Sequence, residues 1–279
     1  MTTSPGPGPV RSAQRGGEAV ARRPEFEWMA RVGLVARGVV YGVIGILALK
    51  LAVGSGGKAT TQRGALETIA REPFGKALLI AMAVGLAGYA IWRLVRAGIG
   101  HGTQQKDSGL QRVAGVASGV AYAALCITAV KILTGASSSG GSNSPKKIAG
   151  GVLGWTGGTL IVGVVGAILI GVALGQGYKG VSKKFLDTSK TGEMSREVKR
   201  SFTAIGVFGH LARMVVFGLI GYGLLKAAID YDPRKAIGLD GALNKLSHNS
   251  YGPFLLGVVA AGLIGFALYS IADARYRKI

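Results

Sequence analysis

The chain has few charged residues, a single cysteine and almost no acidic side chains in its apolar segments. Charged residues make up 16% of the 279 positions, against roughly 25% in soluble proteins, which argues against an ordinary soluble domain. The one cysteine, Cys126, excludes an internal disulfide. Within the apolar segments no Asp or Glu occurs before Asp273, so the buried carboxylates that proton pumps and cation-coupled carriers use are missing.

The sequence also lacks the motifs of common catalytic sites. It has no glycine-rich phosphate loop ending in Lys-Ser or Lys-Thr, no Gly-x-Ser-x-Gly and no His-Glu-x-x-His. The three histidines, His101, His210 and His248, are far apart, and no cysteine or carboxylate stands at ligand spacing from them. We therefore expect no enzymatic activity, no metal site and no cofactor.

Apolar residues are instead abundant, and they are gathered into long blocks. They account for 49% of the chain, and they form six blocks of about 20 residues, the length that crosses the hydrocarbon core of a bilayer. The expected spans are 32–53, 74–97, 112–134, 151–177, 203–229 and 252–273. This pattern predicts an all-α, polytopic membrane protein.

The six blocks are three copies of one two-helix unit. The first arms carry a shared pattern with a lysine nine residues after its aromatic residue: Arg37-Gly38-x-x-Tyr41 with Lys50, Ser118-Gly119-x-x-Tyr122 with Lys131, and Arg213-Met214-x-x-Phe217 with Lys226. In the second arms Gly64-Ala65-Leu66 and Phe74-Gly75 match Gly241-Ala242-Leu243 and Tyr251-Gly252, whereas the middle copy keeps only Trp155 and Gly166 in that register. Three such repeats predict three hairpins in a pseudo-threefold arrangement.

The repeats and the sequences between them divide the chain into five segments. These are a disordered basic tail (1–26), repeat 1 (27–100), repeat 2 (108–180), a basic cytoplasmic link (181–202) and repeat 3 (203–279). Amphipathic stretches at 61–71 and from Asp232-Pro233 onward predict short helices on the outer face of the membrane. The middle copy has a Ser/Gly run at 137–142 instead, and we expect a flexible link there.

The basic residues are distributed unevenly between the two sides of the membrane. Nineteen Lys and Arg residues fall in the tail, the second and fourth links and the C-terminus, against nine in the three alternate links. This bias predicts a multi-pass protein of the cell membrane with both termini in the cytoplasm. The net charge is +20, and the basic residues that carry it lie beside the apolar blocks without aromatic residues between them. We therefore expect anionic lipid of the cytoplasmic leaflet as the partner and no nucleic acid.

Glycine is frequent, at 47 residues. Gly38-x-x-x-Gly42 and Gly115-x-x-x-Gly119 permit close approach of helices in a membrane. The fourth span has so many glycines that we expect it to be packed inside the bundle.

Several of these motifs resemble a known family. They are the run 30–41 (ARVGLVARGVVY), Gly64-Ala65-Leu66, Pro73-Phe74-Gly75, Glu193-Met194-Ser195 and Gly209-His210-Leu211-Ala212-Arg213. From about residue 27 to its end the chain resembles bacterial membrane proteins built of repeats of "domain of unknown function 1206". The middle copy departs from the pattern at Ser118, where the other copies have arginine. The resemblance implies three two-helix repeats in the inner membrane and supplies no activity.

Arginines inside the expected spans are the first candidates for a functional site. Arg37 and Arg213 lie in apolar sequence, where a charge is costly and suggests a function unless the side chain reaches the headgroups. The aromatic residue four positions later, Tyr41 or Phe217, can lie beside the guanidinium. Both arginines are candidates for an anion or lipid-headgroup site. His210, one turn before Arg213, is either a satisfied polar residue or a proton carrier.

Three lysines occupy equivalent positions near the outer ends of the first spans. Lys50, Lys131 and Lys226 can each interact with the C-terminal end of their helix and reach the headgroups. They are either structural anchors or a ring of three ammonium groups around a pseudo-threefold axis.

Two classes of function are compatible with the sequence. The first is a structural or interaction protein that contacts anionic lipid or a membrane-protein partner. The second is a transporter or channel-like protein for an anionic or neutral small solute. A bundle filled by side chains favours the first class, and a polar cavity reaching the middle of the membrane favours the second.

Overall fold

The computed structural model describes residues 24–99, 109–136 and 145–278. Most of the tail predicted at 1–26 and the Ser/Gly run at 137–142 lie outside these residues. Within these ranges six helices are long and apolar enough to cross a membrane: α2 (Pro24–Ala52), α4 (Gly75–Ile99), α5 (Gly109–Leu133), α7 (Gly158–Val181), α8 (Arg196–Ile229) and α10 (Gly252–Tyr276). The prediction of an all-α membrane protein with six spans is confirmed.

A short helix joins the two long helices of every repeat. These helices are α3 (Gln62–Ala70), α6 (Pro145–Leu153) and α9 (Leu239–Ser247), and 3-10 turns lie at Lys184–Thr188 (η1), Thr191–Glu193 (η2) and Pro233–Lys235 (η3). Helix α6 was not predicted. The expected fourth span, 151–177, began too early, because residues 151–153 belong to α6 and α7 begins at Gly158. Its signals were a proline at the first helical position and the buried pair Ala149 and Leu153, one turn apart.

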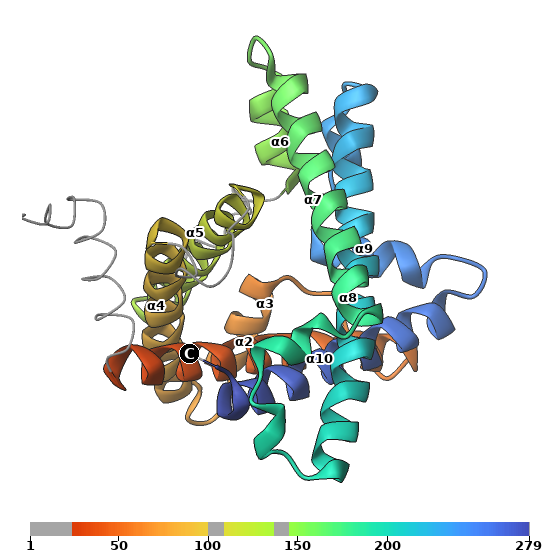
Figure 1. The fold of residues 1–279 in the computed structure, drawn as a ribbon. Helices are drawn as coiled ribbons and strands as arrows, with labels where there is room; N and C mark the ends of the chain where they lie inside the picture. Colours follow the sequence, from red (N-terminus) through yellow and green to blue (C-terminus); the bar gives the residue numbers. More distant parts are fainter. Residues whose placement is uncertain (1–23, 100–108, 137–144, 279) are drawn as a thin grey trace, which may run out of the picture.

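The long helices pair between repeats more closely than within them. Helices α2 and α10 form one antiparallel pair, α4 and α5 a second, and α7 and α8 a third. In Figure 1 the pairs lie along the three sides of a triangle, with α2 and α10 across its lower side. The recurrence of this pairing fits the predicted pseudo-threefold arrangement.

The triangle is closed at only two of its three corners. Helix α2 packs on α4, and α8 packs on α10, so repeats 1 and 3 form hairpins. Within the described residues α5 and α7 do not pack along each other, and the two helices diverge in Figure 1. The ring of helices is therefore open at the middle repeat.

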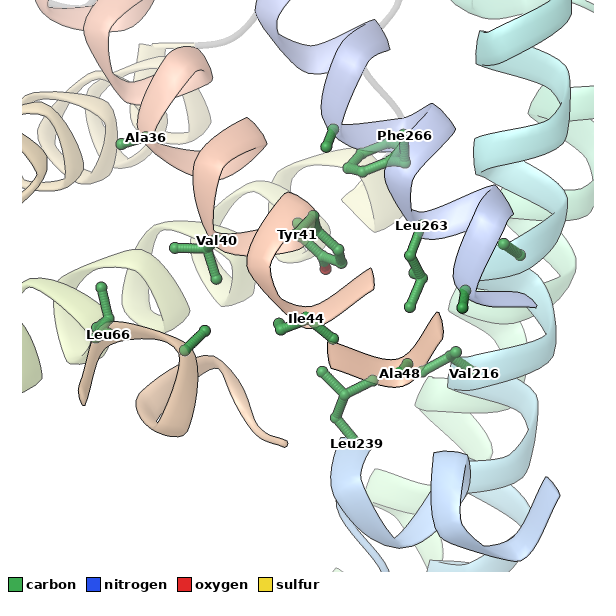
Figure 2. Packing of buried hydrophobic residues seen from close by; sticks show 14 of the residues in the cluster. Ala36, Val40, Tyr41, Ile44, Ala48, Leu66, Val216, Leu239, Leu263 and Phe266 are labelled. Carbon is green, nitrogen blue, oxygen red and sulfur yellow. The ribbon is translucent and has the colours of Figure 1, made fainter. Parts of the chain in front are cut away.

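The short helices contribute to the protein core. Figure 2 shows Leu66 of α3 beside Val40 and Leu239 of α9 beside Ala48, and all four side chains are buried in one cluster. The apolar stripes of α3 and α9 thus face protein. Their leucines are therefore covered by protein and not by lipid, and the position of these helices at the outer face of the membrane stays a prediction.

Glycines set the closest helix contacts. A Cβ at Gly38 would lie 2.7 Å from Ile271 Cγ1 and 2.9 Å from Ala267 O, so α2 and α10 approach closely there. Helix α7 differs from its prediction: one face packs on α8, but Gly171 and Gly175 have no neighbour within 4 Å of a built Cβ. Much of α7 is exposed on the outside of the ring, and its glycines do not show that it is enclosed.

Candidate functional site

The structure corrects the register of the middle repeat. Gly75, Gly252 and Gly158 each begin the second long helix of a repeat, and a Cβ at each would collide with a backbone carbonyl of the preceding short helix. Gly158 is therefore the counterpart of Gly75 and Gly252. The sequence match through Trp155 and Gly166 made residue 156 the counterpart of Gly75. The predicted register of the second arm of repeat 2 was therefore wrong by two residues.

Contacts between the paired helices give the same correspondence. Gly38 faces Ile271 in the α2–α10 pair, Gly119 faces Leu94 in the α4–α5 pair, and Met214 faces Gly177 in the α7–α8 pair. The three interfaces can thus be compared residue by residue. In the α2–α10 pair the positions of interest are Arg37, Ser270 and Asp273. The equivalent residues of the α7–α8 pair are, in the same order, Arg213, Gln176 and Lys179. Those of the α4–α5 pair are Ser118, Arg93 and Arg96.

Arg37 is neutralised by residues of α10. Its Nε donates to Ser270 Oγ at 3.2 Å, and its Nη2 lies 4.0 Å from Asp273 Oδ2. Asp273 is fully buried, and it also accepts hydrogen bonds from Arg277 Nη1 at 2.7 Å and from Ser189 Oγ at 3.2 Å. The carboxylate therefore ties α2, α10 and the link before α8 together. Arg37 is held by protein groups, so headgroup contact is not needed to explain it.

Arg213 has no such counterion in the part of the chain that the structure describes. It stands at the middle of α8, and its Nε is buried without a hydrogen-bond partner. Its guanidinium lies over the rings of Phe266 at 4.3 Å, Phe217 at 5.1 Å and Tyr41 at 5.4 Å. Phe217 is the aromatic partner that the sequence predicted for Arg213, whereas Arg37 lies over Phe266 (5.1 Å) and not over Tyr41.

The residues on α7 that correspond to Ser270 and Asp273 do not neutralise Arg213. Gln176 Oε1 lies 2.6 Å from Nδ1 of His210, and Nε2 of His210 is buried without a partner. Lys179 takes the place of the carboxylate and lies within electrostatic range of both Arg213 and Arg93. The ion-pair position of the first interface is thus filled by a second cation in the third.

Arg93 adds another cation on the side of α4. Its Nε is buried and has no hydrogen-bond partner among the described residues, and the equivalent of Arg37 on the facing helix is the neutral Ser118. Arg93, Lys179 and Asp273 were not among the site residues predicted from the sequence. They emerge only when the three helix pairs are superimposed in the corrected register.

The remaining predicted candidates lie elsewhere. Lys50, Lys131 and Lys226 are exposed in the last turns of α2, α5 and α8. Their role as anchors or as a ring of ammonium groups stays a prediction. Among the described residues, no three His, Cys, Asp or Glu side chains are grouped to hold a metal ion.

A basic groove lies along the first turns of α8. It has a volume of about 540 Å³ and is lined by Lys183, Arg196, Lys199, Arg200, Thr203, Ala204, Val207, Phe208 and Leu211. The basic residues cluster at one end, and the apolar residues continue along α8 toward its middle. Just outside the groove, the Tyr178 hydroxyl raises the pKa of Lys184 above its usual value, so Lys184 remains charged near neutral pH.

A family model described as "Domain of Unknown Function (DUF1206)" matches residues 32–100, 113–183 and 208–277. An uncharacterised protein of Bacillus subtilis (strain 168), YxxB, is 32% identical over 260 residues, which cover 92% of this chain and 93% of that protein. No solved structure matches the chain.

Proposed function

This chain belongs to the family defined by the Domain of Unknown Function DUF1206, and from that premise we infer that it is a non-enzymatic protein of the cytoplasmic membrane that binds anionic lipid. The observation that carries this proposal is the groove on α8. Lys183, Arg196, Lys199 and Arg200 line it together with apolar residues. A phospholipid needs both features, because its headgroup is anionic and its chains are apolar.

The length of α8 supports a position of the groove at the edge of the bilayer. Its 34 residues span roughly 51 Å at 1.5 Å per residue, whereas the hydrocarbon core is about 30 Å thick. The first turns of α8 therefore extend toward the headgroups. The packed core around Ile44, Leu263 and Phe266 (Figure 2) supports a binding or structural role, because side chains fill the space between α2, α8 and α10.

Neutralising the groove should weaken lipid binding. In the variant with Lys183, Arg196, Lys199 and Arg200 all changed to glutamine, we expect the apparent affinity for an anionic phospholipid to fall roughly tenfold or more. Each basic residue near an anionic surface contributes about 1 kcal/mol. The measurement is the thermal stabilisation of the detergent-solubilised protein by phosphatidylglycerol, which should also weaken as salt is added.

The matched control removes the same number of charges from the other end of the helices. It changes four exposed residues to glutamine: Lys58, Arg71, Lys146 and Lys147. The control should retain the affinity for phosphatidylglycerol, and phosphatidylcholine should stabilise all three proteins equally. The proposal fails if both variants lose the same affinity.

The lipid proposal also requires the groove to face the cytoplasm, as the bias in Lys and Arg predicts. Single cysteines can be placed at Gly192 and Ser250 in a Cys126→Ala background; both positions are exposed and lie at opposite ends of the long helices. In intact cells an impermeant thiol reagent should label position 250 and leave position 192 unlabelled until the membrane is broken. Labelling of position 192 alone in intact cells would reverse the orientation.

The alternative function, transport of an anionic solute, is favoured by a different observation. Arg213, at the middle of α8, lacks an ion-pair partner among the described residues. Transport would appear as uptake of labelled phosphate by proteoliposomes, and uptake no faster than in empty liposomes would exclude phosphate as the solute.

A further inference from the structure

The three interfaces between repeats share one geometry but carry different charges. The α2–α10 interface pairs a cation, Arg37, with an anion, Asp273. The equivalent α7–α8 interface places a second cation, Lys179, where Asp273 stands in the first. It therefore has two positive charges, and no carboxylate among the described residues forms an ion pair with either of them.

Arg213 keeps its charge but has no ion-pair partner among the described residues. Arginine stays protonated in proteins, and the buried Nε of Arg213 has no hydrogen-bond partner in this part of the chain. Three aromatic rings surround the guanidinium, and they offer faces of partial negative charge without a full counterion. An unbalanced charge in an apolar span is costly unless an anion accompanies it.

The helix ring has an open corner between α5 and α7, and we expect a ligand to enter there. Helices α5 and α7 diverge on this side (Figure 1). Lys179 on α7 is exposed, Arg93 on α4 and Arg213 on α8 are each partly exposed, and Lys179 lies within electrostatic range of both. The three cations come from three different helices, and Lys179 interacts electrostatically with the other two.

We propose that Arg93, Lys179 and Arg213 form a binding site for one phosphate-type oxyanion at the open corner of the helix ring. The ligand completes the interface by taking the place that the Asp273 carboxylate occupies between α2 and α10. A doubly charged tetrahedral oxyanion suits three cations better than a single carboxylate does. The planar guanidinium groups can each donate two parallel hydrogen bonds to it. The phosphate can belong to a free ion or to a phospholipid headgroup entering between α5 and α7.

The sharpest test converts this interface into a copy of the first one. The Lys179→Asp variant puts a carboxylate beside Arg213, and it should fill the site from within the protein. In phospholipid-free detergent, inorganic phosphate should stabilise the wild-type protein. Above the Kd, each tenfold increase in phosphate concentration should raise the Tm by roughly 3–5 °C. The same additions should leave the Tm of the variant unchanged, whereas its Tm without phosphate should equal or exceed that of the wild type.

Three further variants separate binding from folding. Lys184→Asp makes the same charge change at an exposed residue outside the site and should respond to phosphate as the wild type does. Lys179→Gln removes one cation without supplying an anion, so its response should be reduced but present. Arg213→Lys keeps the charge but removes the planar fork, and it should lose more of the response than Arg37→Lys, because Arg37 is already paired with Asp273.

Parallel titrations identify the source of the phosphate. Stabilisation by inorganic phosphate that Lys179→Asp abolishes supports a free oxyanion. Stabilisation by phosphatidylglycerol alone, also abolished by Lys179→Asp but retained when the α8 groove is neutralised, supports a headgroup at this site. The proposal is overturned if neither ligand stabilises the wild type, or if Lys179→Asp responds as the wild type does.

Discussion

Replacing Asp273 with alanine is expected to lower the Tm of the protein in detergent by roughly 6–20 °C. The carboxylate is fully buried, and its loss leaves Arg37 without a nearby anion and removes the acceptor of Arg277 Nη1. Removing one partner of a buried ion pair costs about 3–5 kcal/mol. Each kcal/mol corresponds to about 2–4 °C in a protein of this size.

A double-mutant cycle shows whether the loss comes from the unpaired cation. Arg37→Met removes the cation and keeps much of the side-chain length, so Asp273→Ala should cost less in that background than in the wild type. Glu193→Ala is the control, because its ion pair with Lys190 is exposed and such pairs contribute about 0–1 kcal/mol. Equal losses from Asp273→Ala in the two backgrounds would show that Arg37 does not depend on this carboxylate.

The six spans could be predicted because hydrophobicity and length are local properties of the sequence. The pairing partners of the long helices could not be predicted. The first arm of each repeat packs most closely on a second arm from a neighbouring repeat, and no local pattern states which one. The glycines of α7 illustrate the limit: Gly166 and Gly177 meet α8, whereas Gly171 meets no neighbour. Composition alone does not distinguish a packing glycine from an exposed one.

The candidate site was predictable in part. Arg37 and Arg213 stand out from sequence because each is a charge in apolar surroundings. Their different environments depend on the facing helix, where Asp273 neutralises one and Lys179 accompanies the other. The middle repeat has diverged so far that its register could be read only from glycine contacts such as that of Gly158. The sequence therefore indicated two equivalent arginines, and the structure shows that they are not equivalent.

The close contact between α8 and α10 leads to the last prediction, which concerns Gly209. A Cβ at this position would lie 2.6 Å from Phe266 Cα and 2.7 Å from Phe266 N. Because these are backbone atoms, the helices must separate to admit a methyl group, and overpacking of this kind costs about 1–3 kcal/mol. We expect Gly209→Ala to lower the Tm by roughly 2–12 °C.

The matched control for Gly209→Ala is Gly175→Ala, on the exposed part of α7. No atom lies within 4 Å of a Cβ built there, so the substitution adds helix propensity, worth up to about 1 kcal/mol, and meets no steric obstacle. Both variants gain the same propensity, and the difference between their Tm values therefore isolates the contact with Phe266. That ring also lies under the guanidinium of Arg213, so Gly209→Ala should weaken the response to phosphate while Gly175→Ala leaves it intact. A Gly209→Ala protein as stable as the Gly175→Ala protein would mean that α8 and α10 are not in contact at this point.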